Sequence, residues 1–159
     1  MQRLVRLLRD TAATNLLEAA IVMPLLLLLT FAIVDFASLF YAYLAIENGA
    51  SIATRYAVTG NTMEDPTKPG VMLSREESIK RALRDATPTL TIPDSYITFS
   101  HLPSGASTFV PGVGGPGEVE KISIDYTWDI MTPLIKPFFT GGAIHLQVDS
   151  AMKNESRFK

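Results

Sequence analysis

Residues 18–43 read EAAIVMPLLLLLTFAIVDFASLFYAY, and this stretch decides how the chain is organised. From Ala19 to Val34 it contains no charged residue. A helix needs about 20 apolar residues to cross the hydrocarbon layer of a bilayer, which is ~30 Å thick. The stretch therefore predicts a transmembrane helix close to the N-terminus.

Two acidic residues, Glu18 and Asp35, bracket the densest part of this apolar stretch. An ionisable group at membrane depth is costly unless it is paired, so Asp35 is interpreted as an intramembrane acid that needs a partner. Two interpretations of Glu18 stay open. It is either an interfacial acid favoured by the positive end of the helix dipole, or a carboxylate that pairs with a positive group in lipid.

The residues before the stretch carry Arg3, Arg6 and Arg9 and only one acid, Asp10. Basic flanks stay in the cytoplasm, so residues 1–13 are predicted to be a basic cytoplasmic leader, and the rest of the chain to lie outside the inner membrane. A cleaved secretory signal is the alternative. Its apolar run is about 7–15 residues long and is followed by a small-residue cleavage site, so the longer run here favours a retained anchor.

Residues 14–58 are predicted to form one long helix. Pro24 removes a backbone hydrogen bond inside it, so a kink or a melted turn is expected there. Small residues recur every three or four positions in the second half, which lets another helix approach closely. That approaching element is either a second subunit or the chain's own C-terminal part. This packing face consists of Ser38, Ala42, Ala45, Gly49 and Ala53.

Residues 61–159 are long enough for one small extracytoplasmic domain. Ser74 and Glu77 fit the capping box that opens a helix, and apolar residues follow at helical spacing up to Pro88. Alternating or β-rich segments then predict strands. The expected fold class is α+β: a long transmembrane helix, one short helix and an antiparallel sheet of about three strands, at residues 96–102, 122–128 and 144–148.

The composition excludes several kinds of chemistry. The sequence has no cysteine, which rules out disulfides, thiolate catalysis and cysteine-based metal sites, and its net charge is −2, with no basic excess for nucleic acid. It contains no nucleophile–base motif and only two histidines, His101 and His145. We therefore expect no enzyme, no cofactor and no metal.

Three weaker patterns have ordinary structural interpretations. Residues 112–117, GVGGPG, match G-x-G-x-x-G, but no helix is expected after them, so a hairpin loop is favoured over a dinucleotide site. Asp125, Asp129 and Asp149 alternate along strands as solvent-facing carboxylates do. Asn154 begins a tripeptide that fits a glycosylation acceptor, which is a pattern common by chance.

Residues 14–25, TNLLEAAIVMPL, resemble the N-terminus of TadE-like pseudopilins of the tight-adherence (Tad, Flp) pilus systems. The family's pattern has a basic leader, a glycine, four residues, a glutamate, an aromatic and an apolar run with proline. Further similar segments follow along the chain. They are Asp35-Phe36, residues 51–57, residues 126–133, Phe138-Phe139 and Asn154-Glu155.

The resemblance implies a pilin-like helix and a site for a prepilin peptidase between Ala13 and Thr14. Ala13 stands where glycine is usual, and Ala19 where an aromatic is usual, so an uncleaved anchor remains an alternative. If the leader is removed, the resemblance gives Glu18 a role in subunit pairing with a free amine of a neighbour.

The function that the resemblance implies is a minor pilin-like subunit that assembles or primes a Tad-type adhesive pilus. Its partners would be the inner membrane, other Tad pilins and pseudopilins, the prepilin peptidase and the Tad inner-membrane platform. One alternative is an uncleaved single-pass scaffold of the Tad secretion machinery. A membrane-anchored periplasmic enzyme is a less favoured one.

Overall fold

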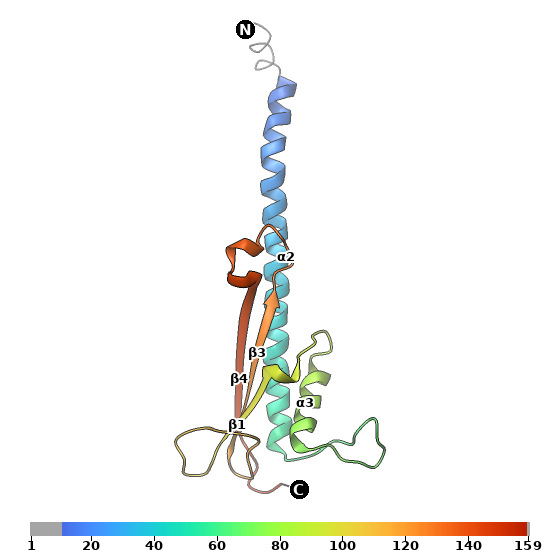
Figure 1. The fold of residues 1–159 in the computed structure, drawn as a ribbon, viewed down its shortest axis with the longest axis vertical. Coiled ribbons are helices and arrows are strands. Elements are labelled where there is room, and N and C mark those ends of the chain that lie inside the picture. The colour runs from blue at the N-terminus through green and yellow to red at the C-terminus, as the bar shows by residue number, and fades with distance from the viewer. Residues whose placement is uncertain (1–10, 159) are drawn as a thin grey trace.

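The structure is a computed structural model and describes residues 11–158. Its dominant element is α2 (Thr11–Val58), a single helix of 48 residues that extends far beyond the rest of the molecule (Figure 1). The predicted long helix is confirmed, and it already includes Thr11, the first of the described residues. It continues through Pro24 without interruption, so the melted turn expected there is wrong. The arginines of the leader lie outside the described residues.

The second half of α2 carries a compact domain. α2 ends at Val58, and Gly60 follows with a φ of 68°, a conformation that glycine adopts without steric cost. The short helix α3 (Arg75–Ala86) begins as predicted at Ser74, whose hydroxyl accepts a hydrogen bond from Glu77 N–H at 3.2 Å. α3 packs along α2 on one side of the domain (Figure 1).

A four-stranded antiparallel sheet covers another side of α2, in the order β2-β1-β3-β4. The three predicted strands are confirmed, and the fold class is α+β. The fourth strand, β2, was missed because two residues within a Gly/Pro-rich loop show no alternation. The strands are β1 (Ile97–Leu102), β2 (Val110–Pro111), β3 (Val119–Asp129) and β4 (Ala143–Lys153).

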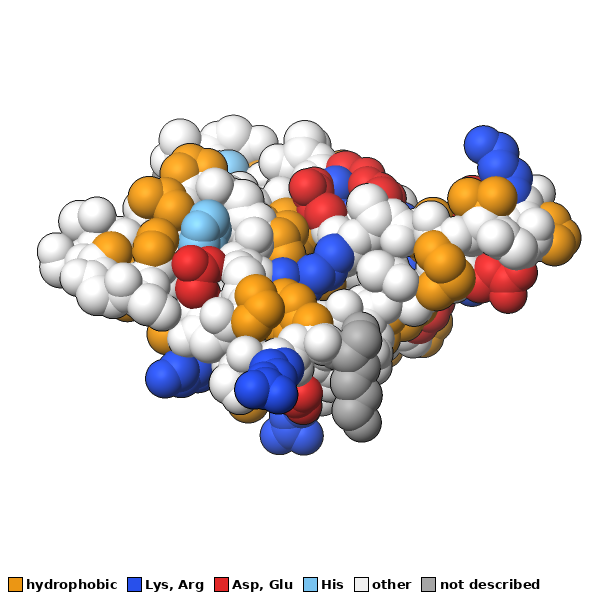
Figure 2. Space-filling view, turned by 90° about the horizontal axis from the view of Figure 1, so that it is seen from below, with side chains coloured by type: hydrophobic (Ala, Val, Ile, Leu, Met, Phe, Trp, Pro, Cys, Tyr) orange, Lys and Arg blue, Asp and Glu red, His pale blue; other side chains and the backbone are white. Residues whose placement is uncertain are grey.

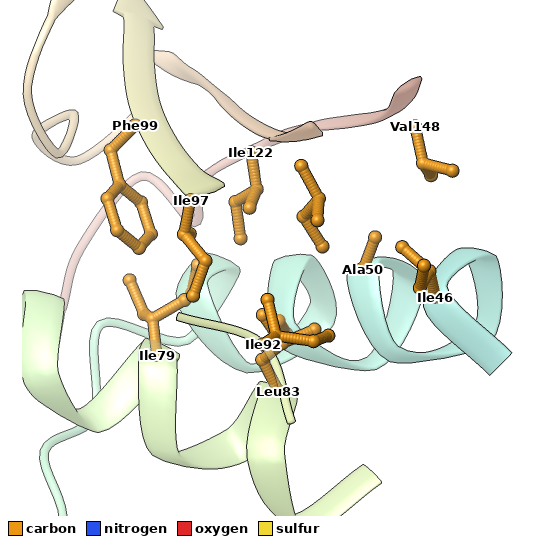
Figure 3. Close-up of a cluster of buried hydrophobic side chains, with 12 residues drawn as sticks. Ile46, Ala50, Ile79, Leu83, Ile92, Ile97, Phe99, Ile122 and Val148 are labelled. Atoms are coloured by element: carbon orange, nitrogen blue, oxygen red, sulfur yellow. The ribbon is translucent and has the colours of Figure 1, made fainter. Parts of the chain in front are cut away.

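The core of the domain lies between the sheet and the two helices. Ile97, Phe99 and Ile122 point from the sheet toward α2 and α3 (Figure 3). Ile46 and Ala50 of α2 are fully buried in the same cluster. The second half of α2 is therefore a structural part of the domain and not a stalk beneath it.

Candidate functional site

The first half of α2 is apolar and exposed. The segment from Ala13 to Val34 makes almost no contact with the domain, and its leucines and isoleucines are open to the surroundings, as in Leu16, which is 74% exposed. α2 is the one helix among the described residues that is long and apolar enough to cross a membrane. This indicates a single-pass membrane protein.

Ala13, Thr14 and Glu18 all lie on the exposed first turns of this segment. No basic side chain among residues 11–158 forms an ion pair with Glu18. Its carboxylate is therefore available to a group outside the described chain.

Asp35 lies where the exposed segment meets the domain, and it is only 6% exposed. Its two carboxylate oxygens accept hydrogen bonds from the backbone N–H groups of Met131 at 3.2 Å and Thr132 at 3.1 Å. These donors belong to the loop between β3 and β4. The partner that an acid at this depth requires is thus supplied by the chain itself.

The small-residue face packs on the chain's own domain. Ala42 and Ala53 are completely buried, and Gly49 is buried against Leu83 and Thr87 at the end of α3. Ser38 and Ala45 are half-buried. The sequence left open whether this face packs on a second subunit or on the chain's own C-terminal part. In the described residues it packs on the C-terminal part.

A buried polar cluster lies at the end of the domain far from the N-terminus, and sequence reasoning missed it. Its centre is Glu120, which is 0% exposed and accepts a hydrogen bond from Gly114 N–H at 2.7 Å. Arg75 lies 3.6 Å from the same carboxylate oxygen and also donates to Gly114 O. Asn154 donates to Gly114 O and Gly115 O. Glu120 shares the alternation of Ile122, and that signal marks it as inward-facing.

Burial sets the titration of this cluster. Loss of solvent raises the pKa of the Glu120 carboxyl, although Gly114 N–H and Arg75 oppose the shift. The same burial lowers the pKa of Arg75. Glu120 Oε1 and Asn154 Oδ1 are buried and lack hydrogen-bond partners among the described residues, so the cluster is only partly satisfied.

The remaining candidates have ordinary environments. The 112–117 segment is a loop that leads into β3, as predicted, and its amides bind Glu118 and Glu120. His145 lies near Thr127, and Asp149 pairs with Lys121 at 3.3 Å. No three His, Cys, Asp or Glu side chains of residues 11–158 are grouped to hold a metal ion.

Residues 16–55 match the family of TadE-like proteins. The resemblance stated from the sequence is confirmed over this TadE-like segment. The segment includes Glu18 of the exposed span and Asp35, which contacts the β3–β4 loop. It also includes Gly49 of the packing face. Over this segment the chain is similar to Tad pilus-related proteins. No curated protein and no solved structure matches it.

Proposed function

We propose that this chain is a minor pilin-like subunit that acts in the assembly or priming of a Tad-type pilus. The observation that carries the proposal is the coincidence of the TadE-like segment with a helix whose first half is bare and whose second half is built into a domain. A bare apolar half holds the subunit in the membrane until it is extracted, and then packs among other helices in a filament.

The proposed orientation places the leader in the cytoplasm and the domain in the periplasm, since Arg3, Arg6 and Arg9 precede the span. After assembly, the domain would lie in the extracellular pilus. The chain would act by association, without a catalytic step or a cofactor.

Glu18 is the proposed pairing residue. If a prepilin peptidase cuts between Ala13 and Thr14, the mature chain begins with an amine one helical turn from Glu18. A lone carboxylate in an apolar bundle is costly, so it favours a position beside the amine of an adjacent subunit. This pairing selects both the partner and the axial offset between two helices.

The runner-up function is an uncleaved scaffold of the Tad secretion machinery. Two measurements on the native host separate it from a subunit. The intact mass of the membrane-extracted chain is expected to correspond to a start at Thr14, and the chain is expected in the filament fraction sheared from cells. A full-length mass together with strict retention in the inner membrane would favour the scaffold.

A further inference from the structure

The loop between β3 and β4 forms a small apolar projection, here called the foot and defined as residues 130–142. It contains the short helices η2 (Lys136–Phe138) and η3 (Thr140–Gly142). Three of its large apolar side chains point away from the protein: Phe138 is 81% exposed, Leu134 is 65% exposed and Met131 is 60% exposed. Such a concentration of exposed apolar side chains on one short loop is unfavourable in water and is typical of a surface that contacts a protein or a membrane.

The foot lies beside the exposed span and not at the distal end of the domain. It crosses α2 where the bare half of the helix begins (Figure 1). A shallow depression between the two is lined by Phe31, Val34 and Asp35 from α2 and by residues 131–134 from the foot. The opposite end of the molecule instead mixes charged side chains of both signs with scattered hydrophobic ones (Figure 2).

The length of the span fixes the depth of the foot. At 1.5 Å per residue, Ala13 to Val34 is about 33 Å long, so a bilayer core of ~30 Å that begins at Ala13 ends beside the foot. If Glu18 instead lies at the first interface, the core extends to about Ser38, and the foot lies within the hydrocarbon. Both placements bring the foot to the bilayer.

Most backbone N–H groups of the foot have acceptors within the protein, which lowers the cost of moving this loop out of water. Non-helical backbone enters lipid only where its polar groups are satisfied internally. Asp35 accepts two of the foot's N–H groups, and Pro133 and Pro137 have none to satisfy. Six further N–H groups donate to carbonyls within the foot, those of Ile130, Ile135, Lys136, Phe138, Phe139 and Gly142.

We propose that the foot inserts into the lipid leaflet on the domain's side of the membrane, with Leu134 and Phe138 among the acyl chains. The exposed ammonium of Lys136 reaches back to the headgroups, as lysine does at interfaces. Asp35 then serves as the internal acceptor that lets the loop enter. The domain is held at a fixed height and tilt on the membrane surface before any partner arrives.

Spin labels test this directly, because the chain has no cysteine of its own. The full-length protein carries Phe138→Cys, Leu134→Cys or the control Phe109→Cys, an exposed phenylalanine of the loop before β2. Each labelled chain is reconstituted, at one chain per nanodisc, into phosphatidylcholine with a minority of phosphatidylglycerol. Power saturation compares collisions with oxygen, which concentrates in lipid, and with a water-soluble nickel chelate.

The proposal expects oxygen to dominate at positions 134 and 138 and nickel to dominate at position 109, which is a reversal of sign of the depth parameter. Adding Phe138→Asp to the Leu134→Cys chain should shift position 134 toward nickel, whereas adding Phe109→Asp should not. Nickel dominance at both foot positions in a folded chain would overturn the proposal. The proposal would also be overturned if positions 134 and 138 were shielded from nickel only when several chains share a disc. That result would mean that a second copy of the chain covers the foot.

Discussion

Gly49 of α2 lies so close to Thr87 that a Cβ atom added to the glycine would be 2.4 Å from Thr87 Cγ2. Thr87 cannot turn aside easily, because it is 2% exposed and its hydroxyl donates to Leu83 O at 2.9 Å. This contact sets the distance between α2 and α3. It also explains a glycine in the middle of a helix, where alanine is otherwise favoured by about 1 kcal/mol.

The first prediction concerns this contact. Gly49→Ala should lower the free energy of unfolding despite its better helix propensity, and Gly49→Leu should lower it more, by roughly 1–3 kcal/mol of overpacking. Unfolding in detergent, followed by the fluorescence of Trp128, measures the change. Ala37→Leu on the exposed side of α2 is the matched control and should be nearly silent. Equal effects at positions 37 and 49 would mean that the α2–α3 contact is not tight.

The second prediction concerns where the domain begins. The buried core includes four residues of α2, namely Ile46, Ala50, Ala53 and Ala57. A fragment of residues 61–159 therefore lacks the helix that covers one side of this core. We expect that fragment to remain unfolded, with poorly dispersed amide resonances. A fragment of residues 35–159, which keeps this part of α2 and Asp35, should fold without the exposed first half of the helix. A folded 61–159 fragment would show that the sheet and α3 form a core of their own.

The third prediction concerns Asp35. Asp35→Ala leaves the N–H groups of Met131 and Thr132 without acceptors. The cost is about 1–3 kcal/mol for a fully buried donor and less for these part-buried ones. Amide hydrogen exchange should accelerate at these two residues. Ser38→Ala is the control, since its hydroxyl donates only to Asp35 O, at 2.9 Å. Unchanged protection in the alanine variant would show that the foot is held by its apolar contacts alone.

The fourth prediction follows from the raised pKa of Glu120. The folded state holds this proton more tightly than the unfolded state. The contribution of Glu120 to stability is therefore fully present below its ordinary pKa and is lost as the pH rises through the higher folded value. Arg75, His101 and Glu118 are the charged or titratable groups around it.

Glu120→Gln keeps the shape and removes the titration, so it isolates this effect. The difference in unfolding free energy between wild type and Glu120→Gln should change in the variant's favour as the pH rises from about 4.5. Glu120→Ala should be destabilising at every pH, because it leaves Gly114 N–H without its acceptor and removes the carboxylate beside Arg75. A difference that does not depend on pH would show that Glu120 titrates normally.

Much of this molecule was readable from local pattern. The apolar run predicted α2, the capping box at Ser74 predicted α3, and period-two alternation predicted β3 and β4. Contacts between distant segments were not readable. The residues near Asp35 in the sequence do not indicate that its carboxylate accepts hydrogen bonds from the N–H groups of Met131 and Thr132, almost one hundred positions later. Likewise, small residues on α2 predict a close neighbour, but only the fold shows that α3 occupies that place.

The role in pilus assembly is tested most directly by the amount of filament sheared from cells whose only copy of this chain carries Glu18→Ala. The substitution removes a charge from an apolar segment, so the chain should insert into the membrane at its normal level. Filament yield should nevertheless fall severely, while Asn15→Ala, a matched change on the same exposed turns, should leave it intact. A wild-type amount of filament from the Glu18→Ala cells would contradict subunit pairing through this residue.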